Sequence, residues 1–408
     1  MKLARAGAVL VAATAAVALT ACGSGFNSGG SAQDSKKPLT VLIGSSGPAE
    51  TAAVKDQVAA WSKSSGIKAT VQAASNLNQQ LAQGFSSGKP ADVFYLSTDA
   101  LAGYASNGSL YAYGDKLDDT SDFYPSLVTS FTYDGKLQCA PKDFSTLQLI
   151  INTDAWSKAG LTDADVPTTW DQLSAVAKKL TTGSQTGLVV SGEYARIGAF
   201  MTEAGGNLMN DDSTKATADT DANLKALQYV QENLKAGDFK FAADVGAGWG
   251  GEAFGKQLGA MTIEGNWISG SQQNDYPDVK YKVVPLPKGP AGAGTLQFTN
   301  CWGVAADSKN KDGAVDLVKT LTSKSDQLAF AKAFGVMPSI QSAASEWKKE
   351  FPDYAPFLDA AAYAKGVPTA KGSADVVTDF NSQVAKLATG DPKAILQSTQ
   401  KNLEALTK

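Results

Sequence analysis

Residues 39–99 decide the fold class and read LTVLIGSSGPAETAAVKDQVAAWSKSSGIKATVQAASNLNQQLAQGFSSGKPADVFYLSTD. Short apolar runs of strand length alternate here with segments whose apolar residues recur at helical spacing, such as Val54, Val58 and Trp61. The predicted strands are 39–44, 67–73 and 93–96, and the predicted helices are 49–64 and 78–86. This alternation predicts an α/β lobe.

Polar residues follow each of these predicted strands at its carboxyl end. Ser46 follows the first strand, Asn76 the second, and Thr98 and Asp99 the third. Open α/β sheets bind their ligands at this edge, so these side chains are candidate ligand contacts. For Asp99 the alternative is a cap on the next helix, a frequent role of aspartate, and loop or cap roles compete equally for Asn76.

The rest of the chain continues with both kinds of element. Further strands are predicted at 147–152, 187–191, 259–264, 281–286 and 299–306, and helices at 170–180, 223–235, 314–334 and from 355 to the end. Gly335, Met337 and Pro338 mark a break between helices. Without leader and tether roughly 370 residues remain, more than one hydrophobic core usually serves, so two lobes are expected.

The N-terminus has the order of a secretory signal. Lys2 and Arg5 precede an apolar, alanine-rich run at 6–19. A helix needs about 20 apolar residues to cross a bilayer, and this run is shorter. We therefore expect residues 1–21 to be removed as a signal peptide.

The end of this leader resembles the lipobox of bacterial lipoproteins. The matching residues are Leu19, Thr20, Ala21 and Cys22. The resemblance implies cleavage before Cys22 and a lipid on its sulfur, whereas the alternative is a soluble secreted protein with an ordinary cysteine. Residues 22–37, rich in Gly and Ser, predict a flexible tether.

The composition excludes several kinds of chemistry. Histidine is absent, so there is no Ser-His-Asp triad, no His-activated cysteine and no usual zinc set. Without Lys2 and Arg5 the balance changes from 36 basic against 40 acidic residues to 34 against 40, which argues against a nucleic-acid partner. An enzyme would have to use carboxylates, Lys or Tyr, as glycosidases do with paired carboxylates.

Two further cysteines, Cys139 and Cys301, remain in the mature chain. In an exported protein two thiols more often pair than stay free, so we expect a disulfide. In the chain-entropy model a bond across so long a loop stabilises by about 5 kcal/mol. The alternative is two buried unpaired thiols.

Five segments in order across the chain resemble the extracellular sugar-binding proteins of ABC importers, the maltose-binding-protein-like family. They are Pro90-Ala91-Asp92-Val93-Phe94 leading into Asp99, Asp134-Gly135-Lys136-Leu137 before Pro141, Leu149-Ile150-Ile151-Asn152 before Trp156, Pro167-Thr168-Thr169-Trp170, and Ala260-Met261-Thr262-Ile263-Glu264-Gly265-Asn266-Trp267. Each segment alone is common, and their order is what makes the resemblance specific.

The resemblance implies a two-lobe, type II periplasmic-binding-protein-like α/β fold with a hinge and an interlobe ligand cleft. Lobe 1 would be residues 38–144 plus 285–333, and lobe 2 residues 145–284 plus 334–408. The chain would cross between them near 143–147, 283–286 and 334–338. Cys139 and Cys301 would then lie together in lobe 1, close to the hinge.

The resemblance also implies ligand contacts. Asp99 matches a family aspartate that binds sugar, and Trp267 matches a tryptophan that stacks on it, with core packing as the alternative for Trp267. Glu193 and Tyr194 match a polar and aromatic pair, although Glu-Tyr-Ala here departs from the Glu-Pro-Tyr of maltose-binding protein. The remaining candidates lie at a strand end, in a glycine-rich loop, at the first crossing, near the hinge and in the C-terminal region: Glu264, Trp249, Lys142, Asp143, Ser145, Trp302 and Ser373. Trp302 is expected either to line the cleft or to pack behind the hinge.

These expectations describe a binding protein without cofactor, metal or catalytic residue. It would be a monomer, lipid-anchored on the extracellular face of a bacterial cell membrane, that delivers a mono- or oligosaccharide to ABC permease subunits. One alternative is a binding protein for a non-sugar solute. A phosphate ester is disfavoured, because Arg196 is the only arginine after Arg5. The other alternative is a carboxylate-based glycoside-cleaving lipoprotein.

Overall fold

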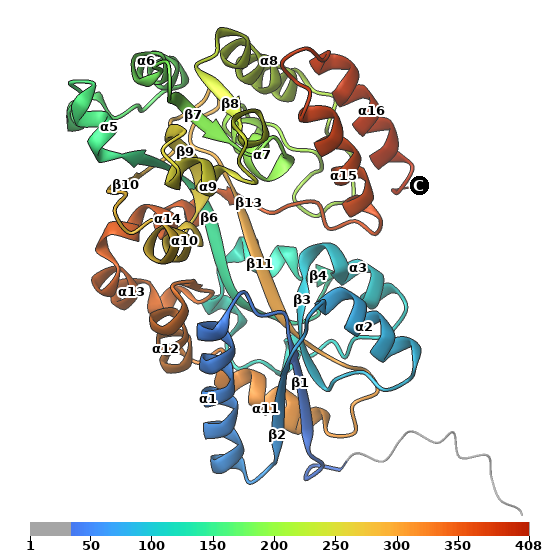
Figure 1. The fold of residues 1–408 in the computed structure, drawn as a ribbon. Coiled ribbons are helices and arrows are strands. Elements are labelled where there is room, and N and C mark those ends of the chain that lie inside the picture. Colours follow the sequence, from blue (N-terminus) through green and yellow to red (C-terminus); the bar gives the residue numbers. More distant parts are fainter. Residues whose placement is uncertain (1–33, 408) are drawn as a thin grey trace, which may run out of the picture. The chain divides into compact units, whose positions relative to one another are not determined.

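The computed structural model describes residues 34–407 (Figure 1). The predicted signal peptide at 1–21, the predicted lipidation of Cys22 and most of the predicted tether at 22–37 lie outside the described residues. Within the described range, no helix has the length and apolar character needed to cross a membrane.

The first elements follow the predicted alternation. They are β1 (Leu39–Ile43), α1 (Pro48–Ser65), β2 (Ala69–Ala73), α2 (Leu77–Ser86), β3 (Val93–Ser97) and α3 (Thr98–Ser106). β2 and β3 both pair with β1 in parallel, so the carboxyl ends of the three strands meet at one edge of the sheet. These elements confirm the α/β prediction for this region. The prediction was possible because the apolar runs are short and are separated by Gly, Pro and Ser.

Two long strands connect this part to the rest. They are β6 (Ala140–Asn152) and β11 (Thr295–Val304). β6 is buried along all 13 residues; its first part pairs with β11 and with β12 (Met337–Pro338), and its second part pairs with β9 (Gly259–Gly265) and β10 (Tyr281–Val284). In Figure 1 both long strands run between the two groups of helices. The segments predicted as crossings fall on β6, on the end of β10 and around β12.

The strand predicted at 147–152 therefore begins earlier than expected, at Ala140. Lys142, Asp143 and Ser145 interrupt the apolar pattern, which made this segment resemble a loop. In the structure these polar side chains are buried and have partners inside the protein.

The remaining elements complete a sheet in the order β2-β1-β3-β11-β6-β9-β7-β8. Those between β3 and β9 are α4 (Pro125–Ser130), β4 (Thr132–Tyr133), β5 (Lys136–Leu137), α5 (Thr153–Lys158), α6 (Trp170–Leu180), β7 (Thr186–Val190), α7 (Tyr194–Glu203), α8 (Asp221–Ala236), β8 (Phe239–Phe241) and α9 (Gly250–Gly255). Those after β9 are α10 (Ile268–Asp275), α11 (Lys311–Leu321), α12 (Lys324–Phe334), α13 (Ala344–Glu350), α14 (Ala355–Asp359), β13 (Ala364–Lys365), α15 (Ser373–Val384) and α16 (Pro392–Glu404). The mainly helical last third is as predicted.

Two large hydrophobic cores lie on either side of the long strands. One contains buried side chains from residues 39–140 and 301–343, and the other contains side chains from 147–296 and 376–403. Each lobe is thus built from separate stretches of chain. Leu286 and Leu296 pack in the second core although the predicted ranges put them in lobe 1. β11 begins at Thr295, whose hydroxyl exchanges hydrogen bonds with the Leu147 backbone, where the second part of β6 starts. The exact lobe boundaries stay a prediction.

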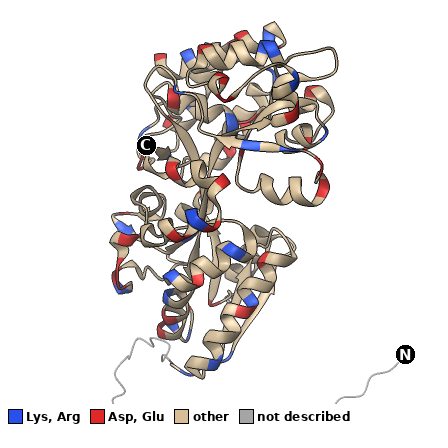
Figure 2. Ribbon diagram, turned by 90° about the vertical axis from the view of Figure 1, so that its left-hand side faces the viewer, with Lys and Arg blue, Asp and Glu red and all other residues tan. Residues whose placement is uncertain are grey.

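Acidic and basic residues are mixed over both lobes. Figure 2 shows Lys and Arg interspersed with Asp and Glu along the helices. The two signs are nearly balanced in number, with 36 basic and 40 acidic residues in the sequence.

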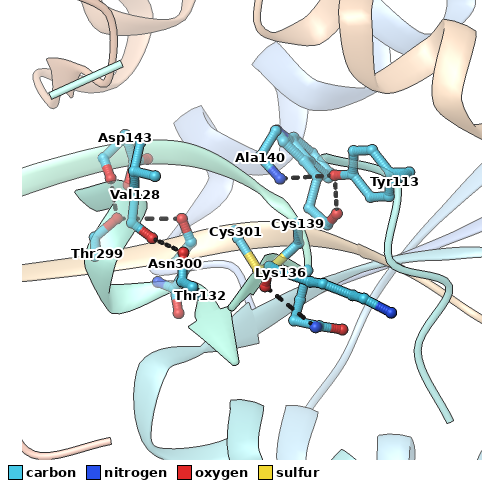
Figure 3. Close-up of a disulfide and its surroundings, with 12 residues drawn as sticks. Tyr113, Val128, Thr132, Lys136, Cys139, Ala140, Asp143, Thr299, Asn300 and Cys301 are labelled. Carbon is cyan, nitrogen blue, oxygen red and sulfur yellow. Dashed lines mark hydrogen bonds between the residues drawn. A yellow bond between two sulfur atoms is a disulfide. The ribbon is translucent and has the colours of Figure 1, made fainter. Parts of the chain in front are cut away.

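A disulfide joins the two long strands at the first-lobe end of the crossing (Figure 3). Cys139 directly precedes β6 and Cys301 lies on β11, with their Cα atoms 5.7 Å apart and both side chains fully buried. Beside the bond, the Tyr113 hydroxyl donates to the carbonyl of Trp302 and accepts from the Ala140 amide at 2.9 Å. The expected bond is therefore confirmed, and it fixes β6 to β11 just before the strands leave the first core.

Replacing both cysteines is expected to lower the stability of the protein. Removal of a native disulfide typically costs about 2–5 kcal/mol, so Cys139→Ser/Cys301→Ser should unfold at a lower denaturant concentration than the wild type, as followed by circular dichroism. A reductant is the control, because it should lower the midpoint of the wild type and leave that of the double variant unchanged. Equal midpoints for the double variant and the wild type would contradict the expectation.

A carboxyl group that has no basic partner among residues 34–407 is buried in the second core. Glu203 ends α7 with 1% of its surface exposed, and its Oε2 accepts a hydrogen bond from Trp170 Nε1 at 2.5 Å. Burial raises the pKa of Glu203 well above its ordinary value, and the hydrogen bond from Trp170 opposes this only in part. The folded protein therefore favours the protonated form.

Glu203→Gln is expected to stabilise the protein increasingly as the pH rises. A raised folded-state pKa means that the favourable contribution of Glu203 is complete below its unfolded pKa and is lost as the pH rises through the folded one. The difference in melting temperature between variant and wild type should be larger at pH 8 than at pH 4. The exposed Glu232→Gln is the control and should show no such trend; a difference independent of pH for Glu203→Gln would contradict the assignment.

Candidate functional site

A cleft of ≈ 560 Å³ lies between side chains that belong to the two lobes. Its walls come from the turn after β1, the start of α3, the middle of β6 and β11, the start of α7, the segment after β9, the end of α12 and the region of α15. Of the predicted contacts, eight line it: Ser46, Thr98, Asp99, Lys142, Asp143, Ser145, Tyr194 and Trp267. The carboxyl edge of the parallel strands thus opens onto the cleft, as predicted.

The wall that α1, α3 and the start of β6 form, called the first wall below, contains a buried lysine held by two carboxylates. The Lys142 ammonium contacts Asp143 Oδ2 and lies 3.3 Å from Glu50 Oε1, with the Tyr95 ring 4.4 Å away. Glu50 Oε2 accepts from the Ser46 amide at 2.7 Å. Burial raises the pKa of Asp143, and the Lys142 charge opposes this rise. The positive charge of Lys142 is therefore neutralised within the wall.

Asp99 presents an exposed carboxylate on the same wall. It lies in the first turn of α3, where the positive end of the helix dipole stabilises a negative charge. Within residues 34–407, no group donates a hydrogen bond to this carboxylate, and the N-cap of α3 is Ser97. Asp99 does not act as the N-cap, which was the alternative role, so its oxygens are available to a ligand.

Trp267 forms a flat surface on the opposite wall. The residue is 37% exposed, and its indole Nε1 donates to Glu264 Oε2 at 2.9 Å. The Phe298 ring meets it edge-on, with centroids 5.5 Å apart. Core packing, the alternative for Trp267, does not describe this position.

The second wall also includes Tyr194 and the start of α15. Tyr194 is almost fully buried, its hydroxyl donates to Asn207 Oδ1, and burial raises its pKa. Val377 and Asn381 of α15 line the cleft, and Asn381 Oδ1 accepts from the Tyr194 amide at 2.7 Å. This wall is therefore mostly apolar, with an amide at its edge.

Six predicted contacts lie outside the lining. Asn76 caps α2 by accepting from the Gln79 amide at 3.0 Å, and Ser373 is buried and donates to the Pro368 carbonyl. Trp302 packs in the first core against Tyr95, so of its two expected roles the structure shows packing. The other three stand behind Trp267 or beside α9: Glu193, Glu264 and Trp249.

Sequence reasoning missed several lining residues. Glu50 lies in the first turn of α1, four positions after Ser46, at a place where the sequence predicts an ordinary helix start. Phe298 and Asn300 lie on β11, whose cleft-facing part was predicted only from 299 onward. The polar Asn300 inside an apolar strand is the signal that could have identified this part.

The donor set of the cleft does not suit a metal ion. Among the described residues, no three His, Cys, Asp or Glu side chains gather in a way that could hold one. In the first wall, the space between Glu50 and Asp143 holds the Lys142 ammonium.

The sequence is similar to those of known bacterial binding proteins. Residues 56–357 match the family model described as bacterial extracellular solute-binding protein. A putative binding protein of Brucella abortus is 25% identical over 346 residues, which cover 81% of this chain and 83% of that protein. The diacetylchitobiose binding protein DasA of Streptomyces coelicolor is 27% identical over 294 residues, 69% of this chain and 68% of its own.

Solved structures share the fold. The cyclic alpha-maltosyl-1,6-maltose binding protein from Arthrobacter globiformis superposes with a TM-score of 0.81 at 21% identity, covering 91% of this chain and 99% of its own. The GacH receptor of Streptomyces glaucescens gives a TM-score of 0.77 at 22% identity, covering 91% and 98%. With a family match that spans most of the chain and a shared two-lobe fold, this chain belongs to the bacterial extracellular solute-binding proteins.

Proposed function

We propose that this protein captures a mono- or oligosaccharide in the cleft and delivers it unchanged to the membrane permease of an ABC importer. The observation that carries the proposal is the pairing of an acceptor-rich wall, with the free Asp99 carboxylate, and the exposed Trp267 ring on the opposite wall. Sugars present hydroxyl groups around a ring with apolar faces, so they need both kinds of surface.

The names of the relatives support a sugar. Two of them are described as a diacetylchitobiose binding protein and as an arabinooligosaccharide-binding protein, the latter from Bacillus subtilis and 26% identical over 52% of this chain. The fold alone does not choose the ligand, since a structure with a TM-score of 0.77 is that of UgpB from Mycobacterium tuberculosis in complex with glycerophosphocholine. The choice therefore rests on the cleft.

The charges of the cleft argue against an anionic solute. Lys142 is the one basic side chain among the described lining residues, and Glu50 and Asp143 already neutralise it. A phosphate or carboxylate guest is typically held by an unpaired Arg or Lys, and the described lining residues offer none. The free carboxylate of Asp99 would repel such a guest.

The same charges argue against glycoside cleavage. That reaction needs one carboxylic acid and one carboxylate on opposite sides of the scissile bond. The carboxylates among the described lining residues are Glu50, Asp99 and Asp143, and two of them are bound to Lys142. One free carboxylate does not supply the pair, so we propose binding without catalysis.

In the proposed mechanism, ligand bridges the two lobes. Asp99 accepts hydroxyl hydrogen bonds on one wall while Trp267 stacks on the ring from the other, and only contacts made in both lobes at once favour closure. The hinge would lie where β6, the end of β10 and β12 cross between residues 38–144 plus 285–333 and residues 145–284 plus 334–408. The protein would act as a monomer, held on the extracellular face of the membrane through lipid on Cys22.

Asp99→Asn and Trp267→Ala are each expected to weaken sugar binding by about tenfold or more, because one weakens charge-assisted hydrogen bonds and the other removes the stacking surface. The wild type is first screened by thermal shift with diacetylchitobiose, arabinooligosaccharides and maltotriose, since a ligand of the native state raises the melting temperature. Calorimetric titration with the sugar that binds then gives the affinities. Asp56→Asn, the same change on an exposed position of α1, is the control, and unchanged affinity in both cleft variants would rule out this site.

Bound sugar is expected to compact the protein and to remain intact. Small-angle scattering should show a smaller radius of gyration with the sugar that raises the melting temperature, because closure brings the lobes together. Chromatography of the released sugar should recover it unshortened and in equimolar amount. Product shorter than the added oligosaccharide would favour the glycoside-cleaving alternative, and an unchanged radius would contradict the hinge.

A further inference from the structure

Trp267 is held in place although much of it is exposed. Its Nε1 donates to Glu264 Oε2 at 2.9 Å, and the edge-on contact with Phe298 has an interplanar angle of 78°. An exposed aromatic ring that is free to turn would have to be ordered when a ligand binds, which costs affinity. The contacts behind the ring therefore determine how much affinity a ligand gains by stacking on it.

Glu264 is the acceptor that fixes the indole, and Arg196 holds Glu264. Glu264 has no exposed surface, and burial raises its pKa while the Arg196 charge opposes that rise. One guanidinium nitrogen of Arg196 binds Glu264 Oε2, and another binds Glu193 Oε1 at 2.8 Å. Without this cation the buried carboxylate would take up a proton or turn away, since an unpaired buried charge is costly.

Arg196 also touches the ring directly. Its Cζ lies 5.4 Å from the Trp267 ring centroid, within the range of a cation–π contact. A guanidinium has donors in a fixed planar arrangement, which an ammonium lacks, so it can bind two carboxylates and lie against a ring together. Every other basic residue after Arg5 is a lysine, so the chain uses arginine where this geometry is needed.

Two glycines leave the space that the arrangement requires. A Cβ at Gly265 would lie 2.2 Å from Trp267 Cζ3, and a Cβ at Gly250 would lie 2.7 Å from Glu264 Oε1. Any larger residue would displace the ring in the first case and the carboxylate in the second. The ring and the acceptor behind it are thus confined from several sides.

We propose that Arg196 is a positioning residue that sets the plane of Trp267 through Glu264 before the ligand arrives. The guanidinium pairs with Glu264 and orients it, Glu264 accepts from the indole Nε1, and the ring is thereby held at the angle at which it faces the cleft. That a sugar stacks on the ring rests on the proposed function. The fixed orientation of the ring is a property of the protein without ligand.

The test compares Arg196→Met/Glu264→Gln with Glu264→Gln. The single variant keeps an oxygen that accepts from Trp267 Nε1 and keeps the guanidinium, while the double variant removes the guanidinium without leaving a buried charge unpaired. The readout is the indole Nε1–H nuclear magnetic resonance signal of Trp267, identified by its loss in Trp267→Phe. Its hydrogen exchange without ligand should be about tenfold faster in the double variant and within about threefold of wild type in the single one.

Affinity is the second readout. For the sugar that wild type binds, among diacetylchitobiose, arabinooligosaccharides and maltotriose, the double variant should bind about tenfold more weakly and Glu264→Gln within about threefold of wild type. Lys282→Met/Asp163→Asn is the matched control, because this ion pair lies beside the Trp156 ring away from the cleft. It should leave both the Trp267 signal and the affinity unchanged.

The outcomes separate this inference from the proposed function. Wild-type exchange of Trp267 in the double variant would overturn the role of Arg196, whether or not a sugar binds. If the wild type binds none of the sugars, the proposed function fails, and the exchange rates still decide the role of Arg196. Should the double variant not fold, Arg196→Lys keeps a cation for Glu264 but loses the planar fork, so exchange as slow as in wild type would again overturn the proposal.

Discussion

The structure depends on the pairing of β6 with strands of both lobes. One half of this strand pairs with β11 and β12 and the other half with β9 and β10, so a single buried strand belongs to both halves of the fold. Because its backbone hydrogen bonds are made on both sides, the middle of β6 is a fixed reference for the side chains on either wall. The cleft lies beside this stretch, where Asp143 and Ser145 line it.

A polar group can be buried in such a strand only if the protein supplies its partner. Lys142 has two carboxylates, Ser145 donates to Asn266 Oδ1, and the Asp143 carbonyl accepts from Thr299 Oγ1 at 2.6 Å. These groups are oriented before any ligand binds. The cleft therefore offers a guest mainly acceptors on one wall and an aromatic face on the other, and this limits the class of guest more than its volume does.

Much of the fold could be predicted from the sequence, since β1 and β3 are compact apolar runs and polar residues follow β1, β2 and β3 at one edge. Asp99 and Trp267 could be placed on opposite walls through the family resemblance, and both line the cleft. The start of β6 could not, because Lys142 and Asp143 read as loop residues until their mutual pairing is known. Glu264 shows the same limit: its type suggested a ligand contact, but its burial and its bond to Arg196 depend on tertiary packing.

The bond between Cys139 and Cys301 also has a topological consequence. It spans 162 positions, and the second-core side chains from Leu147 to Leu296 all lie within that span, whereas the C-terminal helices α15 and α16 lie outside it. Much of the second lobe is thus a closed ring of chain attached to the first lobe. A single protease cut anywhere in this ring leaves the two fragments covalently attached, so the damaged molecule still migrates as one piece until a reductant separates it.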